Sequence, residues 1–516
     1  MPYAYKPFDY VAPPGLSAAE PRHRVAIVGA GPIGLAMAIE LANHGIAAVV
    51  LDDNNVVSVG SRAICWSKRA LEVLDRLGVG AQCVEKGVTW KVGRTFHRET
   101  EVFSFDLLPE DGHKMPAFVN LQQYWVEEYL VARAVALGVD LRWKNRVTGL
   151  VQHADHAVLT VETPDGSYAL EAGWVVACDG ARSPVRGMLG LEFEGELFEE
   201  RFLIADIEME ADFPSERRFW FEPAFHNGQS ALLHKQPDNI YRIDLQLGWN
   251  TDPEVEKQPE RIIPRIELVV GHRNFTLDWT SIYTFQCRRL RSFVHDRVIF
   301  AGDSAHVVSP FGARGGNSGL QDVDALGWRL AAVIKGQAPV AALAAYDRER
   351  TFGADENLMN SSRSTRFMSP AEGVERLFRD AVLHLAGRAD FARPMVNSGR
   401  LSVPCVYPLN APDDTGLPVG TRPGAVAPDA PLGDGWLLEA LAGGFTLLVL
   451  GQGVREVPGV RMLAPEMTET LRRRYLGGAE KALYLIRPDQ VVAARWVAAE
   501  PQEIAEAFAA AWEGRT

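Results

Sequence analysis

The first strong apolar pattern of the chain begins at Arg24 and predicts a strand, a tight turn and a helix. The run RVAIVGAGPIGLAMAIELANHG places β-branched residues before the glycines and apolar residues at helical spacing after them, up to Gly45. The stretch AAVVLDD (47–53) then has the composition of a second, buried parallel strand. Together these segments predict a βαβ unit in an α/β fold.

Four further segments have the apolar spacing of helices. The segments 61–77 and 120–137 each end before a glycine, which is a natural stop. The segments 316–335 and 338–357 follow one another in the second half of the chain and have the same periodicity.

Between about residues 190 and 290 the pattern changes to alternation. The runs 217–223, 230–235 and 240–248 alternate and are rich in aromatic residues. Such runs are typical of an antiparallel sheet with one face toward solvent or a ligand.

The last part of the chain has its own pattern. Residues 404–431 are dense in Pro, Gly and Asp, which is typical of a linker. The runs 445–450, 481–486 and 491–496 are predicted to be strands, and 501–512 is predicted to be a terminal helix. A small α/β domain is therefore expected at the C-terminal end.

Composition and charge narrow the class of protein. The 516 residues have a formal net charge of -13, which argues against a nucleic-acid partner. No apolar run reaches the roughly 18 residues that a membrane span needs, and the N-terminus lacks a signal pattern. The five cysteines are scattered without metal-binding spacing, so we expect reduced thiols, no metal and a cytoplasmic location.

The glycine pattern at residues 29–34 predicts a dinucleotide site. Gly29 permits the tight turn, Gly31 lets the backbone approach a pyrophosphate, and Gly34 lets the helix pack on the strand. An acid about 20 residues further on binds a ribose hydroxyl in such sites. Asp52 has this position, and Asp53 competes with it.

Two later motifs also place a turn after an apolar strand. In VVACDGARSPVR (175–186), the strand ends at Asp179-Gly180. In the segment 298–330, a buried strand runs into Gly302-Asp303, and a loop with Pro310 and four glycines leads to a helix. Because glycine permits close approach, this loop predicts a cradle lined by backbone.

The three motifs, in this order and at these distances, resemble those of the class A flavoprotein monooxygenases. That family includes p-hydroxybenzoate hydroxylase, phenol hydroxylase and 3-(3-hydroxyphenyl)propionate hydroxylase. The resemblance covers about residues 24–400 and implies a Rossmann-like FAD-binding fold of the p-hydroxybenzoate hydroxylase type. It implies FAD as cofactor, NAD(P)H and O2 as co-substrates, and hydroxylation of a phenolic substrate through a flavin C4a-hydroperoxide.

The resemblance also implies roles for individual residues. The Asp179 motif serves FAD and NAD(P)H, the Gly302-Asp303 motif contacts the ribityl chain, Arg62 lies near the FAD phosphates and Gln123 touches the flavin side chain. The helix that begins near Gly315 would aim its N–H groups at the negative charge of the reduced flavin. The expected FAD-binding set is Gly29, Gly31, Pro32, Ile33, Gly34, Asp52, Asp53, Arg62, Gln123, Asp179, Gly302, Asp303, Pro310, Gly315, Gly316 and Asn317.

The group that activates the phenol is not fixed by these motifs. By resemblance, the carbonyl of Pro310 faces the substrate ring. A base or relay that ionises the phenol would speed ring attack. The candidates in the central sheet are His226, His234, Tyr241 and Arg242.

These expectations divide the chain into parts. We expect an N-terminal arm (1–22), an FAD-binding domain with a helical extension (23–190 and 290–400), a substrate-binding sheet (191–289), a linker (401–435) and a C-terminal domain (436–516). The run LYLIRPDQVVAARW (483–496) resembles the thioredoxin-like domain of the phenol hydroxylase branch, here without redox cysteines. The family also allows a homodimer.

Four alternatives compete with this function. A flavin-dependent halogenase is disfavoured because no Trp-x-Trp occurs, and a nicotinamide dehydrogenase is disfavoured by the Asp179-Gly180 and Gly302-Asp303 motifs. A monooxygenase of a polyketide or antibiotic, and a non-catalytic flavin-binding homologue, remain open.

Overall fold

A computed structural model gives the fold of the chain. It describes residues 3–211, 213–226, 228–248, 251–309, 312–396, 401, 403–441, 443–451, 453 and 456–515. Among the helices in these ranges, none is both long and apolar enough to cross a membrane.

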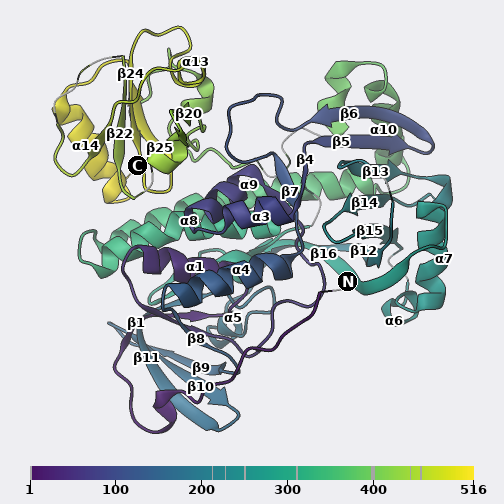
Figure 1. The fold of residues 1–516 in the computed structure, drawn as a ribbon, viewed down its shortest axis with the longest axis horizontal. Coiled ribbons are helices and arrows are strands. Elements are labelled where there is room, and N and C mark those ends of the chain that lie inside the picture. Colours follow the sequence, from purple (N-terminus) through teal and green to yellow (C-terminus); the bar gives the residue numbers. More distant parts are fainter. Residues whose placement is uncertain are drawn as a thin grey trace.

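The first sheet is mostly parallel and carries the predicted βαβ unit (Figure 1). Its main path follows the order β17 (Val294–His295), β18 (Val298–Phe300), β11 (Gly166–Ala177), β1 (His23–Val28), β2 (Ala48–Leu51) and β8 (Asp140–Arg142), with β9 (Arg146–Gln152) and β10 (Ala157–Thr163) extending from β11. The helices that accompany this sheet are α1 (Pro32–Asn43), α4 (Gln123–Ala136), α5 (Pro184–Met188) and α8 (Gly315–Ile334). The apolar residues of β1 and β2 are fully buried or nearly so, as a parallel sheet between helices requires.

The second sheet has eight strands and stands at the right of Figure 1. Its order is β19 (His306–Val307), β16 (Thr276–Arg289), β12 (Glu194–Glu208), β15 (Ile240–Leu247), β14 (Ala231–Lys235), β13 (Arg217–Phe221), β5 (Val92–His97) and β6 (Thr100–Asp106). The predicted strands of the central region are present. However, β5 and β6 fall inside the range expected for the FAD-binding domain, so the sheet does not follow the predicted boundary at residue 190.

Helices cover both faces of this second sheet. One face packs on α7 (Pro259–Val270), whose buried residues include Ile262 and Ile266; α6 (Pro253–Glu256) precedes it. The other face turns toward the first sheet and, at one end, packs on α9 (Leu343–Met368) and α10 (Val374–Ala386) through Met368 and Leu383. The short helix α11 (Arg393–Val396) follows α10.

The predicted helix 61–77 is wrong in its first half. Residues Cys65–Ser67 form strand β3, which pairs with β7 (Phe118–Asn120); β4 (Val88–Trp90) completes this three-stranded sheet. Helix α2 begins only at Lys68 and ends at Arg76, and α3 (Gly80–Lys86) follows. Arg62 has a φ of +46°, a left-handed conformation that an α-helix excludes.

The C-terminal part forms the separate lobe at the upper left of Figure 1. Its sheet has the order β23 (Arg461–Leu463), β22 (Thr446–Leu450), β24 (Ala482–Ile486) and β25 (Val492–Trp496), with only β22 and β23 parallel. The helices are α12 (Leu437–Ala440), α13 (Glu469–Leu471) and α14 (Pro501–Trp512), and β20 (Pro431–Leu432) pairs with β21 (Gly435–Trp436). These strand directions are those of the expected thioredoxin-like arrangement.

The segment predicted to be a linker packs on the C-terminal sheet. Val426 forms a bridge with Val491, and Asp413 forms one with Arg495, so this segment runs along the C-terminal sheet. Trp328 of α8 packs in the same core, 5.5 Å from Phe445 between ring centroids.

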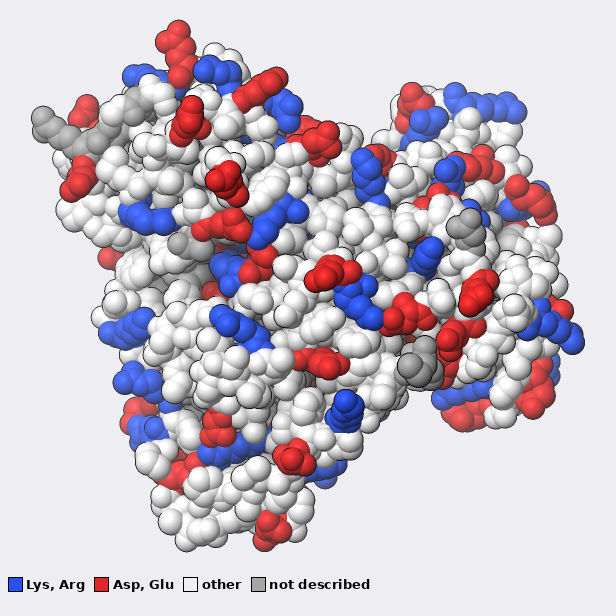
Figure 2. Space-filling view, in the orientation of Figure 1, with Lys and Arg blue, Asp and Glu red and all other residues white. Residues whose placement is uncertain are grey.

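The surface carries both signs of charge. On the face in Figure 2, Lys and Arg side chains are interspersed with Asp and Glu. This face therefore lacks the continuous basic stripe that is typical of nucleic-acid binding.

Candidate functional site

The first glycine turn, between β1 and α1, has the shape that a pyrophosphate requires. Gly29 has a φ of +102°, and a Cβ there would lie 2.5 Å from the carbonyl oxygen of Cys178. A Cβ on Gly34 would lie 1.9 Å from the carbonyl oxygen of Gly29. Gly31, the N-cap of α1, has open space: nothing lies within 4 Å of its Cβ position. Pro32 then begins the helix without needing an N–H partner, and the free N–H groups of this turn suit an anion.

The other two predicted motifs lie against this turn. β11 and β18 are the next strands after β1, so Asp179 and Gly302 both follow carboxyl ends at one edge of the sheet. Ile33 connects the motifs, because a Cβ on Gly302 would lie 3.0 Å from its Cγ1 and a Cβ on Gly319 would lie 2.6 Å from its Cδ1. The convergence predicted from the sequence is therefore present in the fold.

The two candidate ribose acids have different surroundings. Asp52 accepts hydrogen bonds from the backbone N–H of Ala30 at 2.6 Å and of Asn54 at 2.8 Å, and burial raises its pKa. Its carboxylate thus holds the glycine turn in place. Asp53 is exposed at the same strand end. A ribose contact by either acid stays a prediction.

Two partly buried carboxylates fit a ligand with hydroxyl donors. Asp303 has no hydrogen bond within the described part of the chain, and burial is the main cause of its raised pKa. Asp179 accepts from the N–H of Val185 at 3.0 Å, but its Oδ1 is buried without a partner. Unpaired buried acceptors are costly. The hydroxyl groups of the ribityl chain and ribose would satisfy them, so the residues present fit FAD.

Arg62 and Gln123 shape one wall of this site. Gln123 donates to the Ser58 hydroxyl at 2.9 Å and to Glu127 at 2.8 Å, while its Oε1 accepts from the N–H of Ala63 at 3.2 Å. Gln123 thus holds the loop that carries Arg62, whose side chain is exposed. Direct flavin contacts by these two residues stay predictions.

The start of α8 offers its backbone rather than its side chains. Gly315 and Gly316 are its first residues, and a Cβ on Gly315 would lie 3.9 Å from Oδ1 of Asp303. Asn317 is buried, and its Nδ2 donates to the carbonyl oxygen of Cys65 at 2.8 Å. The Asn317 side chain therefore fixes β3, and the first turn presents N–H groups beside Asp303.

Comparison with known proteins decides the family. A family profile described as "FAD binding domain" matches residues 22–361. The chain belongs to this family of FAD-dependent monooxygenases. A flavin-dependent monooxygenase of Mycobacteroides abscessus is 31% identical over 445 residues, 83% of this chain and 88% of that protein. A 3-(3-hydroxy-phenyl)propionate/3-hydroxycinnamic acid hydroxylase of Mycolicibacterium smegmatis is 26% identical over 361 residues, 70% and 64% of the two chains. The crystal structure of p-nitrophenol 4-monooxygenase from Pseudomonas putida DLL-E4 has a TM-score of 0.65 and 25% identity, and covers 73% of this chain and 97% of that one.

A buried acid of the monooxygenase, Asp322 on α8, escaped the sequence prediction. Its Oδ2 accepts from the backbone N–H of Gly302 at 2.8 Å and contacts Nε2 of His306 at 2.7 Å. Its Oδ1 accepts from Nε of Arg350 at 2.6 Å. Asp322 is fully buried, and burial acts to raise its pKa, but His306 and Arg350 outweigh this and lower it. A charged residue in an apolar helix was the signal that could have revealed it.

The second sheet turns one row of side chains toward β3 and the start of α8. The strand register places His234 opposite Arg242 and Arg242 opposite Asp206, and Arg217 precedes Arg218, which pairs with Leu233 beside His234. The Nδ1 of His234 lies 3.9 Å from Sγ of Cys65, whose backbone is held by α8. The row, called here the polar row, consists of Arg217, His234, Arg242, Asp206 and Trp279.

Arg242 is engaged with protein groups. It donates to Asp244 at 2.6 Å and to the carbonyl oxygen of Arg62 at 2.5 Å. It therefore ties the second sheet to the loop at the FAD site, rather than acting as a base.

Two of the predicted catalytic candidates lie elsewhere. Tyr241 belongs to the core on the α7 face, and its hydroxyl donates to the carbonyl oxygen of Ala211 at 2.8 Å. His226 is buried, and its Nε2 lies 2.8 Å from the carbonyl oxygen of Gln246. Side chains of consecutive residues in a strand point to opposite faces. Arg242 shares a face with its partner His234, so the adjacent Tyr241 lies on the opposite face from His234. Tyr241 therefore faces away from the polar row, and His226 has a structural partner; a catalytic role for either residue stays a prediction.

Pro310, predicted to line both the flavin and the substrate, lies outside the described residues.

Elsewhere, His97, Glu222 and Asp380 have ligand atoms close enough for a metal. Glu222, however, accepts hydrogen bonds from Arg376 and Arg379, which already neutralise it.

Proposed function

We propose that the enzyme hydroxylates a phenolic ring held between the polar row and the start of α8, using NAD(P)H and O2. The observation that carries this is the contact between His234 and Cys65, because it brings the sheet and the α8 loop to one place. Bound FAD supplies the hydride acceptance and oxygen activation; the protein residues position the ring and its oxygen.

The polar row suits an ionised phenol. Arg217 makes no ion pair among the described residues, and its Nε is buried without a hydrogen-bond partner. Burial lowers the pKa of Arg217, as expected for a cation that lacks a counter-ion. A phenolate oxygen would supply that charge, and ionisation makes the ring a better nucleophile.

The same face continues into a buried aromatic cluster. Phe202 and Phe285 stack with centroids 4.7 Å apart, and Phe221 belongs to the same cluster beside Met368 of α9. Because α9 and α10 cover this cluster, it supports the sheet beside the polar row and offers no free surface to a substrate.

Replacing Arg217 with glutamine is expected to lower kcat/KM for phenols about ten- to a hundredfold, while the flavin spectrum stays unchanged. Loss of one close buried charge is worth roughly 1.5–3 kcal/mol. The measurement is substrate-stimulated NAD(P)H oxidation over a panel of phenols. Arg218→Gln is the matched control, because Arg218 pairs with Glu216 at 2.9 Å. Equal rates for the two variants would contradict the proposal.

The pH profile gives a second test. Burial lowers the pKa of His234 well below 6.5, and the charges of Arg217 and Arg242 lower it further. His234 is therefore neutral at pH 7, and the wild-type rate should show no acid limb near pH 6.5. In Arg217→Gln, the pKa of His234 rises, so an acid limb attributable to this residue moves to higher pH. A limb that moves to lower pH in Arg217→Gln, or a wild-type limb near pH 6.5 that disappears in His234→Gln, contradicts this assignment.

We also propose a cytoplasmic location. All five cysteines are free, and four of them are buried, as expected in a reducing compartment.

A further inference from the structure

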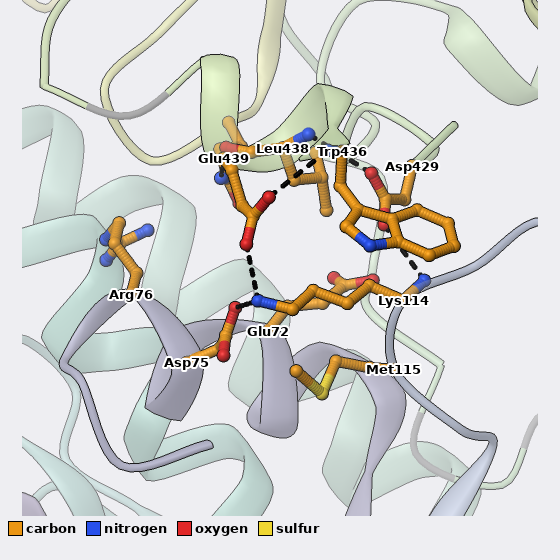
Figure 3. A pocket seen from close by; sticks show the side chains of 10 residues that line it. Glu72, Asp75, Arg76, Lys114, Met115, Asp429, Trp436, Leu438 and Glu439 are labelled. Atoms are coloured by element: carbon orange, nitrogen blue, oxygen red, sulfur yellow. Dashed lines mark hydrogen bonds and ion pairs between the residues drawn. The ribbon is translucent and has the colours of Figure 1, made fainter. Parts of the chain in front are cut away.

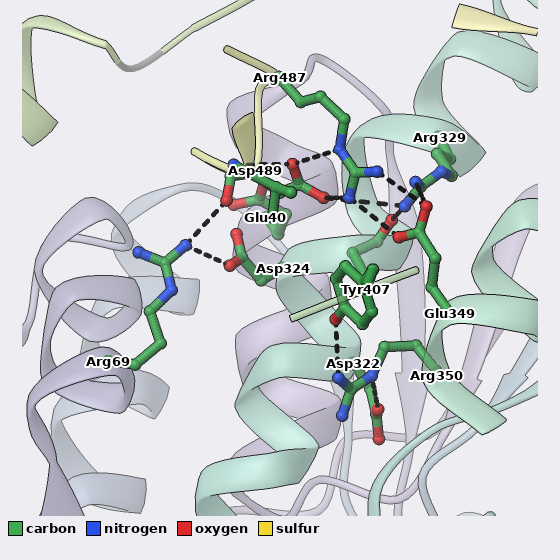
Figure 4. A network of polar contacts seen from close by, with 12 residues as sticks. Glu40, Arg69, Asp322, Asp324, Arg329, Glu349, Arg350, Tyr407, Arg487 and Asp489 are labelled. Carbon is green, nitrogen blue, oxygen red and sulfur yellow. Dashed lines mark hydrogen bonds and ion pairs between the residues drawn. The ribbon is translucent and has the colours of Figure 1, made fainter. Parts of the chain in front are cut away.

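The C-terminal lobe contacts the FAD-binding body through buried charges (Figure 4). Arg487, in the turn between β24 and β25, donates to both oxygens of Glu349 on α9, at 2.7 and 2.9 Å. Arg69 on α2 donates to the carbonyl oxygen of Asp489 at 2.9 Å and to the side chain of Gln490 at 2.7 Å. All five residues are at least nine-tenths buried. Charges so far from water hold their partners in fixed positions, because each broken contact leaves a buried charge unpaired.

Next to the network lies a cavity of about 250 Å³, lined on one side by α2 and on the other by α12 and the preceding turn (Figure 3). Lys114 spans it, with Nζ 2.5 Å from both Asp75 and Glu439. The buried network is therefore the charged part of an interface that also includes the apolar contact of Trp328 with the core of the lobe.

This path leads to the turn that carries Asp303. The guanidinium of Arg487 lies 5.9 Å from the ring of Tyr407, and the Tyr407 hydroxyl accepts from Arg350 at 2.8 Å. Arg350 donates to Asp322, which in turn accepts from the N–H of Gly302. Four contacts thus join the C-terminal lobe to the first residue of the turn.

Each member of this path has little freedom. Asp322 and Arg350 are fully buried, and Tyr407 is 7% exposed. Arg350 also donates to the hydroxyl of Ser318 at 2.9 Å, so its guanidinium group is held by both Asp322 and Ser318. A shift of the Tyr407 hydroxyl would leave a guanidinium donor unsatisfied and allow Arg350 to move away from Asp322.

We propose that Tyr407, Arg350 and Asp322 are positioning residues, through which the docked C-terminal lobe fixes the Gly302-Asp303 turn for FAD. Coupling between two sites is reciprocal: FAD binding must then strengthen docking of the lobe by the same factor. The C-terminal lobe would contribute to cofactor affinity without touching the cofactor.

Tyr407→Phe tests this with little change in packing, because it removes only the hydroxyl. The FAD dissociation constant is measured by flavin fluorescence on reconstituted apoprotein, and we expect it to rise about five- to tenfold. Tyr475→Phe is the control. Its hydroxyl is also buried and donates to a backbone carbonyl, that of Pro428, but it lies off the path. Equal FAD affinities for the two variants would overturn the proposal.

The reciprocal measurement is decided in the wild-type protein, so its main outcome does not depend on how a variant folds. Hydrogen exchange of residues 482–496 is compared with and without FAD. We expect FAD to slow exchange there in the wild type and to do so less in Tyr407→Phe. Equal exchange rates of these residues with and without FAD in the wild type would rule out the coupling. Both experiments use FAD alone, so a wrong substrate assignment does not affect them.

Discussion

Gly31→Ala is expected to leave the protein folded and to weaken FAD binding at least a hundredfold. Gly31 has a φ of -72°, which alanine adopts freely, and nothing lies within 4 Å of its Cβ position. The added methyl group therefore costs the apoprotein little. It does occupy the space where a pyrophosphate approaches the helix N-terminus, and a hundredfold loss corresponds to about 2.7 kcal/mol.

Two other glycines set the contrast for this experiment. A Cβ on Gly34 would lie 1.9 Å from a backbone oxygen, so Gly34→Ala should lower the unfolding temperature of the apoprotein as well as FAD affinity. Gly420→Ala is the neutral control, since its Cβ also meets open space but lies in the linker segment. The measurements are thermal unfolding of the apoprotein and FAD titration. If Gly31→Ala binds FAD as tightly as Gly420→Ala, the first turn does not hold the pyrophosphate.

The FAD site was the most predictable part of the molecule. In a parallel sheet, the residues after each strand gather at one edge, so Gly29, Asp179 and Gly302 had to meet once their strands were recognised. Each motif is local in sequence. The helices after the first and third turns follow from apolar spacing, and α14 was predicted with the bounds that it has.

The substrate side was less predictable because its residues meet only through strand register. Local alternation identified the strands that carry His234 and Tyr241, but not which face each residue takes. The helix predicted over 61–77 failed for a related reason. Its apolar spacing suits a helix, but pairing with β7 and the left-handed conformation of Arg62 override it. The path from Arg487 to Asp322 joins residues that are 165 positions apart in sequence (487 − 322), and no short pattern records it.

Glu349→Gln is expected to be the most destabilising of these substitutions. One carboxylate serves two buried guanidinium groups: Arg329 donates to it at 2.8 Å, and Arg487 does so at 2.7 Å. Burial acts to raise the pKa of Glu349, but these two cations outweigh it and lower the pKa, so the group is ionised. Glutamine keeps the shape and removes the charge. Breaking a buried pair in this way costs about 3–5 kcal/mol.

The sign of the pH dependence follows from the same shift. Because folding lowers the pKa of Glu349, its contribution is complete above the unfolded value of 4.5 and is lost as pH falls through the lower folded value. Glu254→Gln is the control: Glu254 is exposed, pairs with Lys257, and should change stability by less than about 0.5 kcal/mol. The denaturation midpoint of each variant is measured at pH 7. A Glu349→Gln midpoint equal to that of Glu254→Gln would mean that Asp489, 2.5 Å from Arg487, suffices for both arginines. The lobe would then be held by its apolar core around Trp328, and not by charge.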